Sequence, residues 1–234
     1  MRSVGSPPTG KPLTMLTMPR DLLRVAAWCG GLALVLTLLV AWHGTPMPWD
    51  VRIIREFQGV RLLDRNEGWV NALGKPWWQL GMALAALVLA AFGPQLGIHG
   101  GSRGARLAAA WTVLLALGLR LLSSPLKQMA QAERPSTDFH VRVTAEFSGY
   151  GFPSGHVFGD VLIYGALAVV APALIGRGPG AALRVFLGVV IVLAGPSRMA
   201  IGAHWPSDVA GGLLWGAAAL CLAVFGGRRL AGQR

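Results

Sequence analysis

Three short polar segments interrupt the long apolar stretches of this sequence, and their side chains are of the kinds that bind and attack phosphate. They cover residues 127–135 (KQMAQAERP), 153–156 (PSGH) and 197–208 (SRMAIGAHWPSD). Together they contain three cations, two histidines and an aspartate that follows the second histidine. Uncompensated charge beside apolar, membrane-like stretches is energetically costly and usually functional. These segments are therefore the first candidates for a functional site.

The first group of candidates would bind an anion. Arg134 and Arg198 can each present two N–H groups to phosphate oxygens, and Lys127 supplies a point charge. Ser154 and Gly155 directly precede an apolar stretch, so backbone N–H groups at a helix N-terminus would face the anion, and glycine allows close approach. Ser154 can add a hydroxyl donor or cap the helix. The five residues predict a phosphate-binding site.

The two histidines, His156 and His204, predict phosphoryl transfer through a covalent intermediate. One imidazole would attack phosphorus, and the other would protonate the leaving oxygen and then activate water. A nucleophilic imidazole needs an acceptor on its second nitrogen. Asp208, four residues after His204, is placed to be that acceptor, because Pro206 suits the first turn of a helix and Asp208 would face back from it. The cations already neutralise phosphate, so we expect no metal and no other cofactor.

Asp160 is a further candidate with two open interpretations. It lies four residues after His156, which places both on one face of the expected helix. An acid inside an apolar span is a functional hypothesis by default, and Asp160 would keep His156 protonated as an acid. The alternative is a polar contact with neighbouring helices.

Six apolar stretches surround these segments, and each is a candidate to cross a bilayer, which takes about 20 residues. They cover residues 22–42, 77–93, 105–122, 156–175, 182–195 and 207–226, of which the second and fifth are short. Breaks rich in Gly, Pro and Arg separate them at 93–94, 176–179 and 195–196. With six spans in series, all three polar segments fall on the same side of the membrane. We predict an all-α fold, a six-transmembrane helical bundle, as a single domain over residues 1–234.

Two regions outside the spans have their own pattern. Residues 1–20 form a polar tail, and we expect the first span to be retained, with a cleaved signal peptide as the less favoured alternative. Residues 48–75 place Ile53, Ile54, Phe57 and Val60 on one face of a helix. This amphipathic segment would lie in the headgroup region, or pack on the bundle as a short extramembrane helix.

Composition supports a membrane protein. Apolar residues make up 53% of the chain and charged residues only 13%, whereas a soluble globular protein has about 25% charged residues. If the N-terminus is cytoplasmic, the inner segments contain eleven basic residues and one acid, Asp21, and so carry +10 of the net charge of +11. The count of basic residues alone is nearly even, with eleven inside and ten elsewhere. We expect an integral protein of a bacterial inner membrane, with both termini cytoplasmic and the site on the periplasmic face. Nucleic acid is not needed to explain the charge.

The three segments resemble the signature of the type-2 phosphatidic acid phosphatase superfamily, K-x6-R-P, P-S-G-H and S-R-x5-H-x3-D. Every fixed position and both fixed internal spacings are present between residues 127 and 208. The resemblance implies that His204 is the nucleophile, His156 the general acid and Asp208 the partner of His204. It also implies that phosphate is held by Lys127, Arg134, Ser154, Gly155 and Arg198. Asp160 is no part of the signature.

By this resemblance, the chain is expected to be a metal-independent membrane phosphatase that acts on a lipid phosphate or pyrophosphate through a phosphohistidine. Undecaprenyl pyrophosphate, phosphatidylglycerol phosphate, phosphatidate and lipid A phosphate are all candidate substrates. A lipid phosphotransferase of the same family, or a non-catalytic protein that binds or transports lipid phosphate, remains an alternative. The membrane spans argue against the soluble vanadium haloperoxidases of the superfamily. The sequence does not predict an oligomeric state.

Overall fold

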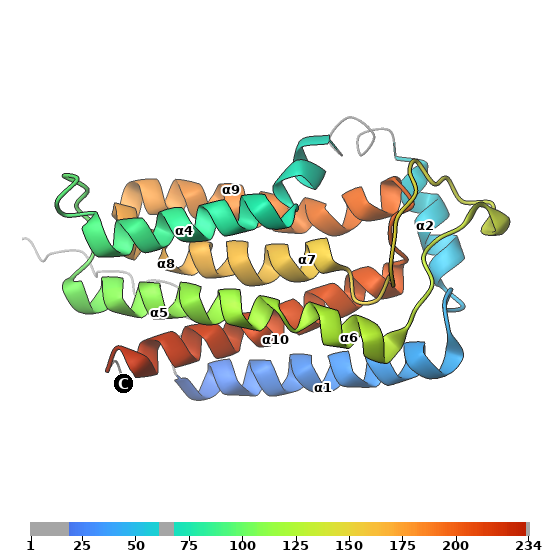
Figure 1. The fold of residues 1–234 in the computed structure, drawn as a ribbon, viewed down its shortest axis with the longest axis horizontal. Coiled ribbons are helices and arrows are strands. Elements are labelled where there is room, and N and C mark those ends of the chain that lie inside the picture. The colour runs from blue at the N-terminus through green and yellow to red at the C-terminus, as the bar shows by residue number, and fades with distance from the viewer. Residues whose placement is uncertain (1–18, 61–67, 233–234) are drawn as a thin grey trace, which may run out of the picture.

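The computed structural model describes residues 19–60 and 68–232, which form helices and loops with no β-strand among them. The main helices are α1 (Pro19–His43), α2 (Asp50–Gln58), α4 (Pro76–Phe92), α5 (Arg103–Arg120), α6 (Ser123–Ala130), α7 (Gly155–Gly159), α8 (Gly165–Ile175), α9 (Arg177–Ala200) and α10 (Pro206–Leu230). A 3₁₀ turn covers Thr137–Phe139, and a π-helical segment, Asp160–Tyr164, joins α7 to α8. The long helices run side by side in one bundle (Figure 1). The predicted all-α class is confirmed.

Five helical stretches are long and apolar enough to cross a membrane: Arg20–His43, Arg103–Ala130, Gly155–Ile175, Arg177–Ala200 and Pro206–Leu230. The sixth predicted span corresponds to α4, which has 17 residues. At 1.5 Å per residue α4 is about 25 Å long, shorter than the roughly 30 Å hydrocarbon core of a bilayer. Five spans are therefore supported by length and composition, and the count of six stays a prediction.

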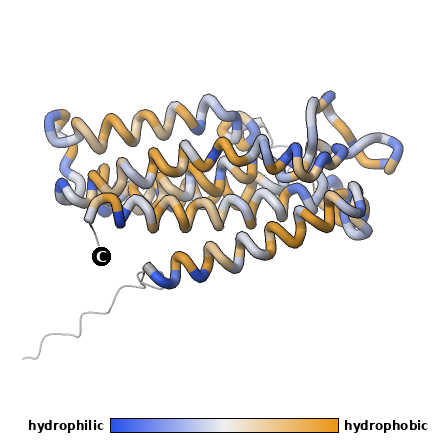
Figure 2. The backbone as a smooth tube through the Cα atoms, turned by 60° about the horizontal axis from the view of Figure 1, so that its bottom comes forward, coloured by the Kyte–Doolittle hydropathy of each residue, from blue (hydrophilic) through white to orange (hydrophobic). Residues whose placement is uncertain are grey.

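The outer surface of the bundle is apolar. Trp28, Trp42 and Val192 are 75%, 85% and 71% exposed, and many leucines are also exposed, though most of them less so. Figure 2 shows that the hydrophobic residues run along the long helices, whereas hydrophilic residues gather toward their ends and in the loops. A surface of this kind is stable against lipid tails, not against water.

One predicted boundary was wrong. The pair Gly195-Pro196 does not break the fifth span, because α9 continues through Pro196 to Ala200. Membrane helices tolerate such a proline where neighbouring helices compensate for the lost backbone hydrogen bond. Arg198 therefore lies on the last turn of a helix and not in a loop. In the third span, α5 ends at Arg120 and Lys127 lies on the separate short helix α6.

Glycines allow α10 to pack closely against α7 and the π-helical segment that follows it. A Cβ at Gly212 would lie 2.9 Å from the Ser154 carbonyl oxygen, and one at Gly216 would lie 2.8 Å from the Val161 Cβ. Small residues at helix contacts permit this close approach in membrane proteins. The first turns of α7 and α10, which carry two of the polar segments, are consequently held side by side.

Helix α2 packs on the bundle. Ile54 is fully buried in a cluster with Val141 and Trp205, so residues 50–58 pack on the bundle, and their position relative to the headgroup region stays a prediction. The rest of the amphipathic segment includes residues 61–67, which lie outside the described residues, as do residues 1–18 of the polar tail. The start of α1 and the end of α10 lie at one end of the bundle, and α2 and α6 lie at the other (Figure 1).

Candidate active site

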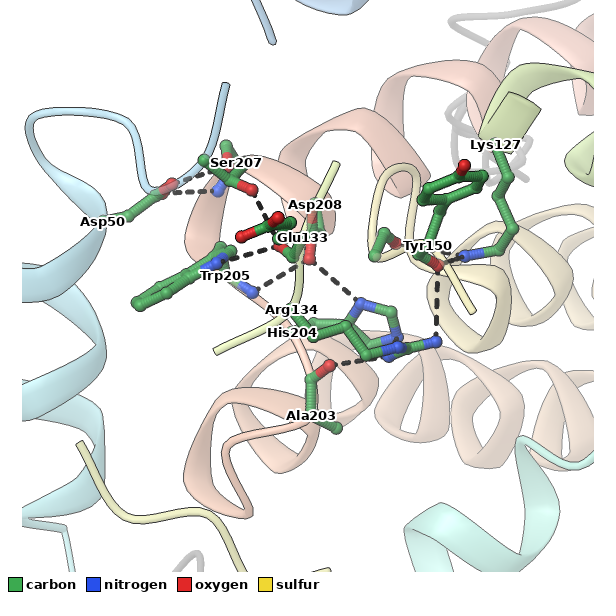
Figure 3. A network of polar contacts seen from close by, with 12 residues as sticks. Asp50, Lys127, Glu133, Arg134, Tyr150, Ala203, His204, Trp205, Ser207 and Asp208 are labelled. Carbon is green, nitrogen blue, oxygen red and sulfur yellow. Dashed lines mark hydrogen bonds and ion pairs between the residues drawn. The ribbon is translucent and has the colours of Figure 1, made fainter. Parts of the chain in front are cut away.

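The first and third polar segments meet in one network of polar contacts (Figure 3), and Ser154 of the second segment donates its backbone N–H to the Asp208 carbonyl. Lys127 comes from α6, Arg134 from the loop that follows it, and Arg198 from the end of α9. Ser154 and His156 flank the start of α7, whereas His204 lies in the short connection between α9 and α10. The convergence that helix parity predicted is present in the structure.

His204 and Asp208 form a buried pair. The Nδ1 atom of His204 lies 3.1 Å from Oδ2 of Asp208, and the two side chains are 2% and 0% exposed. The same oxygen accepts a hydrogen bond from the Trp205 backbone N–H at 3.0 Å, which fixes the carboxylate on the first turn of α10. With Nδ1 donating to this carboxylate, the lone pair of a neutral His204 is on Nε2.

Arg134 lies at the free nitrogen of His204. Its Nη1 atom is 3.3 Å from Nε2 and donates to the Ala203 carbonyl at 2.7 Å. Its Nε donates to the Gly149 carbonyl at 2.9 Å. The guanidinium is therefore anchored on two loops, with its charge next to the atom that would attack a phosphate.

Burial lowers the pKa of His204 well below its ordinary value, and repulsion from Arg134, Arg198 and Lys127 lowers this pKa further. The imidazole is consequently neutral at neutral pH, and its Nε2 lone pair faces the Arg134 guanidinium, which a phosphate oxygen would engage in its place. A dianionic phosphate among the same cations would offset the repulsion, so the positive charge that develops on an attacking imidazole becomes tolerable when substrate is bound.

The remaining cations are also held in place. Lys127 donates from Nζ to the carbonyl oxygens of Tyr150, at 2.5 Å, and Gly151, at 3.1 Å. Arg198 is 7% exposed and donates from Nη1 to Asn71 Oδ1 at 3.1 Å. Among the described residues its Nε has no partner, and neither does the buried Ser154 hydroxyl. Two buried donors without an acceptor fit an anion-binding site.

Ser154 does not cap the helix with its side chain. Its backbone N–H donates to the Asp208 carbonyl at 2.9 Å, so the hydroxyl and not this N–H is available to an anion. A Cβ at Gly155 would lie 3.9 Å from both Arg120 Nη2 and Lys127 Cε. The backbone of Gly155 is thus next to two cations, as a phosphate cradle requires.

His156 is half-buried and makes no hydrogen bond to the described residues, which leaves both ring nitrogens available. Asp160 accepts a hydrogen bond from Gln79 Nε2 of α4 at 2.8 Å. His156 and Asp160 both border Gly74, where a Cβ would lie 2.6 Å from His156 Cδ2 and 3.2 Å from Asp160 Oδ2. The helix contact is therefore present, and an effect of Asp160 on the protonation of His156 stays a prediction.

Two polar residues of the site were missed in the sequence. Arg120 donates to the Gly155 carbonyl at 3.0 Å and to Gln79 Oε1 at 3.3 Å. Its signal was an ionisable residue inside a predicted span, the same criterion that identified Asp160. Asp50 is fully buried and accepts from the Ser207 N–H and hydroxyl at 2.8 and 2.7 Å. In the sequence it is indistinguishable from an ordinary acid in the first turn of a helix.

Phe147, in the loop before α7, was also missed. The Arg134 and Arg198 guanidinium carbons lie 5.9 and 5.4 Å from its ring centre. Both distances suit cation–π attraction. A ring that contacts both guanidinium groups helps to hold the two cations near one another in spite of their mutual repulsion.

A cavity of about 560 Å³ lies between α4 and α5 beside this site. Its polar lining includes Gln79 and Arg120, and its apolar lining includes Leu80, Leu117 and Ile163. Because Arg120 also contacts Gly155, the polar part of the cavity adjoins the predicted phosphate site.

Comparisons with known proteins agree with the three motifs. The family model described as the PAP2 superfamily matches residues 108–228, more than half of the 234-residue chain. A relative named phosphatidylglycerophosphatase B, from Bacillus subtilis (strain 168), is 34% identical over 110 residues, which cover 44% of this chain and 51% of that protein. The chain thus aligns with about half the length of this curated relative.

A solved structure has a similar fold. It is described as the crystal structure of the first transmembrane PAP2 type phosphatidylglycerolphosphate phosphatase from Bacillus subtilis. The TM-score is 0.51 with 21% sequence identity, and the match covers 88% of this chain and 93% of that one. At this identity the likeness concerns the fold.

Proposed function

This chain belongs to the PAP2 superfamily, and we propose that it is an integral membrane phosphatase that hydrolyses a lipid phosphate or pyrophosphate. One observation carries the proposal. His204 is held through Nδ1 by Asp208, while Nε2 faces the guanidinium of Arg134. A buried, neutral imidazole with its free nitrogen at a cation is arranged to attack a phosphorus atom whose oxygens that cation binds.

In the first step, phosphate oxygens bind Lys127, Arg134, Arg198, the Ser154 hydroxyl and the backbone of Gly155. Nε2 of His204 attacks phosphorus and the bond to the leaving oxygen breaks. His156 donates a proton to that oxygen. Asp208 stabilises the positive charge on the phosphorylated imidazole through the Nδ1–H hydrogen bond.

In the second step, the neutral His156 removes a proton from water. The resulting hydroxide attacks phosphorus, the P–N bond breaks and inorganic phosphate leaves. His204 and His156 return to their starting protonation states, so the cycle consumes one water per phosphate released. No metal takes part in the proposed cycle.

The cavity between α4 and α5 supports a lipid substrate. Its apolar lining suits an acyl or prenyl chain, whereas Gln79 and Arg120 lie toward the phosphate site. The name of the Bacillus subtilis relative makes phosphatidylglycerol phosphate the first substrate to test. Undecaprenyl pyrophosphate, phosphatidate and lipid A phosphate belong in the same panel. We further propose that the site faces the periplasm, with both termini in the cytoplasm.

The test is phosphate release by the purified protein in detergent. We expect turnover of at least one lipid phosphate, unchanged by EDTA and abolished in His204→Ala. The exposed His99 lies outside the site, so His99→Ala is the matched control and should keep full activity. Acid-labile phosphate on the protein, absent from His204→Ala, would identify the phosphohistidine.

The alternatives predict different products. A phosphotransferase would place the phosphate on an added acceptor lipid and release little of it to water. A non-catalytic binding protein would bind the substrate panel without turnover, and that result would refute the proposal.

A further inference from the structure

A second cavity lies between α4 and α5 at the end of the bundle away from the catalytic residues. Its volume is about 520 Å³, and it is lined by Arg103 and Arg106 together with Leu87 and Leu107. Arg103 begins α5 and Arg120 ends it, so the 18-residue helix separates this cavity from the active site by about 25 Å. The two sites are therefore distinct.

Among the described residues, the arginines of this cavity have no acidic partner. The sequence contains no Asp or Glu between Glu67 and Glu133, and none between Asp160 and Asp208 or after Asp208. Among the described residues at this end of the bundle, the carboxylate is Asp21 of α1, and it already pairs with Arg24 at 3.4 Å. Charge that the protein leaves uncompensated at a membrane surface attracts anionic lipid.

Arg106 has a donor that lacks an acceptor. Its Nη1 donates to the Gly101 carbonyl at 3.0 Å, whereas its Nε is buried and has no partner among the described residues. An arginine that only sets membrane orientation would keep its N–H groups in water. A buried N–H beside a cavity instead fits an oxygen acceptor bound there, and phosphate suits guanidinium geometry.

The other wall of the cavity is apolar. Leu107 is 48% exposed, and Leu87 and Ala90 continue the same surface from α4. A cavity with cations at one side and hydrocarbon-compatible walls at the other matches the two halves of a phospholipid. A free phosphate ion would use only the cations.

We propose that this cavity binds an anionic phospholipid, with its phosphodiester on Arg103 and Arg106 and its acyl chains along Leu87 and Leu107. The lipid is a bound partner and not a substrate, because the described residues that line the cavity include no histidine or other nucleophile. This binding does not depend on the proposed catalytic function.

The experiment is native mass spectrometry of the full chain in detergent, titrated with dioleoyl phosphatidylglycerol or dioleoyl phosphatidylcholine. Wild type should retain one phosphatidylglycerol more strongly than phosphatidylcholine. Arg103→Gln/Arg106→Gln should weaken that retention about thirtyfold, from roughly 1 kcal/mol for each cation. The control Arg228→Gln/Arg229→Gln, which removes two charges at the same end outside the cavity, should keep it. Arg134→Gln should also keep it.

Several results would overturn the proposal. These are equal retention of the two lipids, equal loss in the control variant, or loss in Arg134→Gln alone, which would place the lipid in the active site. Displacement by millimolar inorganic phosphate would overturn the assignment to a lipid. Because the double variant risks misfolding, the exposed Arg103→Gln change is measured as well. It should weaken retention about fivefold while the protein elutes as wild type in gel filtration.

Discussion

Asp50 should organise the helix that carries Asp208, although it lies outside all three motifs. Its carboxylate accepts from the Met47 N–H at 2.8 Å, the Ser207 N–H at 2.8 Å and the Ser207 hydroxyl at 2.7 Å. It thereby joins α2 to the first turn of α10 (Figure 3). Asp50→Ala removes the acceptors of all three hydrogen bonds at once.

The magnitude follows from the groups left behind. Met47 and Ser207 are 5% and 1% exposed, so their backbone N–H groups would lose their acceptors away from water. Each unsatisfied donor costs about 1–3 kcal/mol. Burial raises the pKa of Asp50, so the charged carboxylate is itself unfavourable there, and its removal offsets part of the loss. We expect Asp50→Ala to destabilise by about 2–4 kcal/mol, and Asp50→Asn, which keeps one acceptor oxygen, by about half of that.

The assay combines thermal unfolding in detergent with steady-state kinetics on the best lipid phosphate. Because Ser207 is adjacent to Asp208, a looser first turn should misalign His204 and lower kcat about tenfold or more, with a smaller change in KM. Asp138, an exposed carboxylate near the site, is the control, and Asp138→Ala should change stability by less than about 0.5 kcal/mol. Wild-type stability and kcat in Asp50→Ala would refute the reasoning. Lower stability with unchanged kcat would show that Asp50 stabilises the fold but does not position the catalytic residues.

Three other predictions use the same substrate. A Cβ at Gly151 would lie 2.7 Å from Asp208 Oδ2, so Gly151→Ala should lower the melting temperature. A Cβ at Gly155 would meet nothing nearer than 3.9 Å, so Gly155→Ala should raise KM while the protein keeps wild-type stability. Burial, and after it the charge of Arg134, lowers the pKa of His204, so protonation of His204 should reduce kcat/KM only well below pH 6.5. Arg134→Gln removes one of these causes and should move the acid limb of the pH–rate profile to higher pH. An unmoved limb would contradict the assignment of that limb to His204. Phe147→Ala should raise KM severalfold by freeing Arg134 and Arg198, and Phe147→Tyr should restore it, whereas equal KM values in the two variants would exclude the cation–π role.

The sequence alone was enough for features that depend on local geometry. Pro206 suits the first turn of a helix, which makes Asp208 face back toward the preceding loop, so the sequence predicted its contact with His204. The length of the apolar stretches predicted the helices, and helix parity predicted that three distant polar segments would meet. Gly195-Pro196 was misinterpreted because a proline stops a helix in water more reliably than inside a packed membrane bundle.

Only the tertiary structure could decide which distant groups complete the site. Arg134 and His204 are 70 residues apart in sequence, and Asp50 and Ser207 are 157 apart. Whether such pairs touch depends on how closely the helices pack and how they are rotated, as at Gly212 and Gly216 of α10. Those quantities arise from the fit of many side chains together. The residue types therefore predicted the phosphate chemistry, and the packing determined that Asp50, Arg120 and Phe147 also belong to the site.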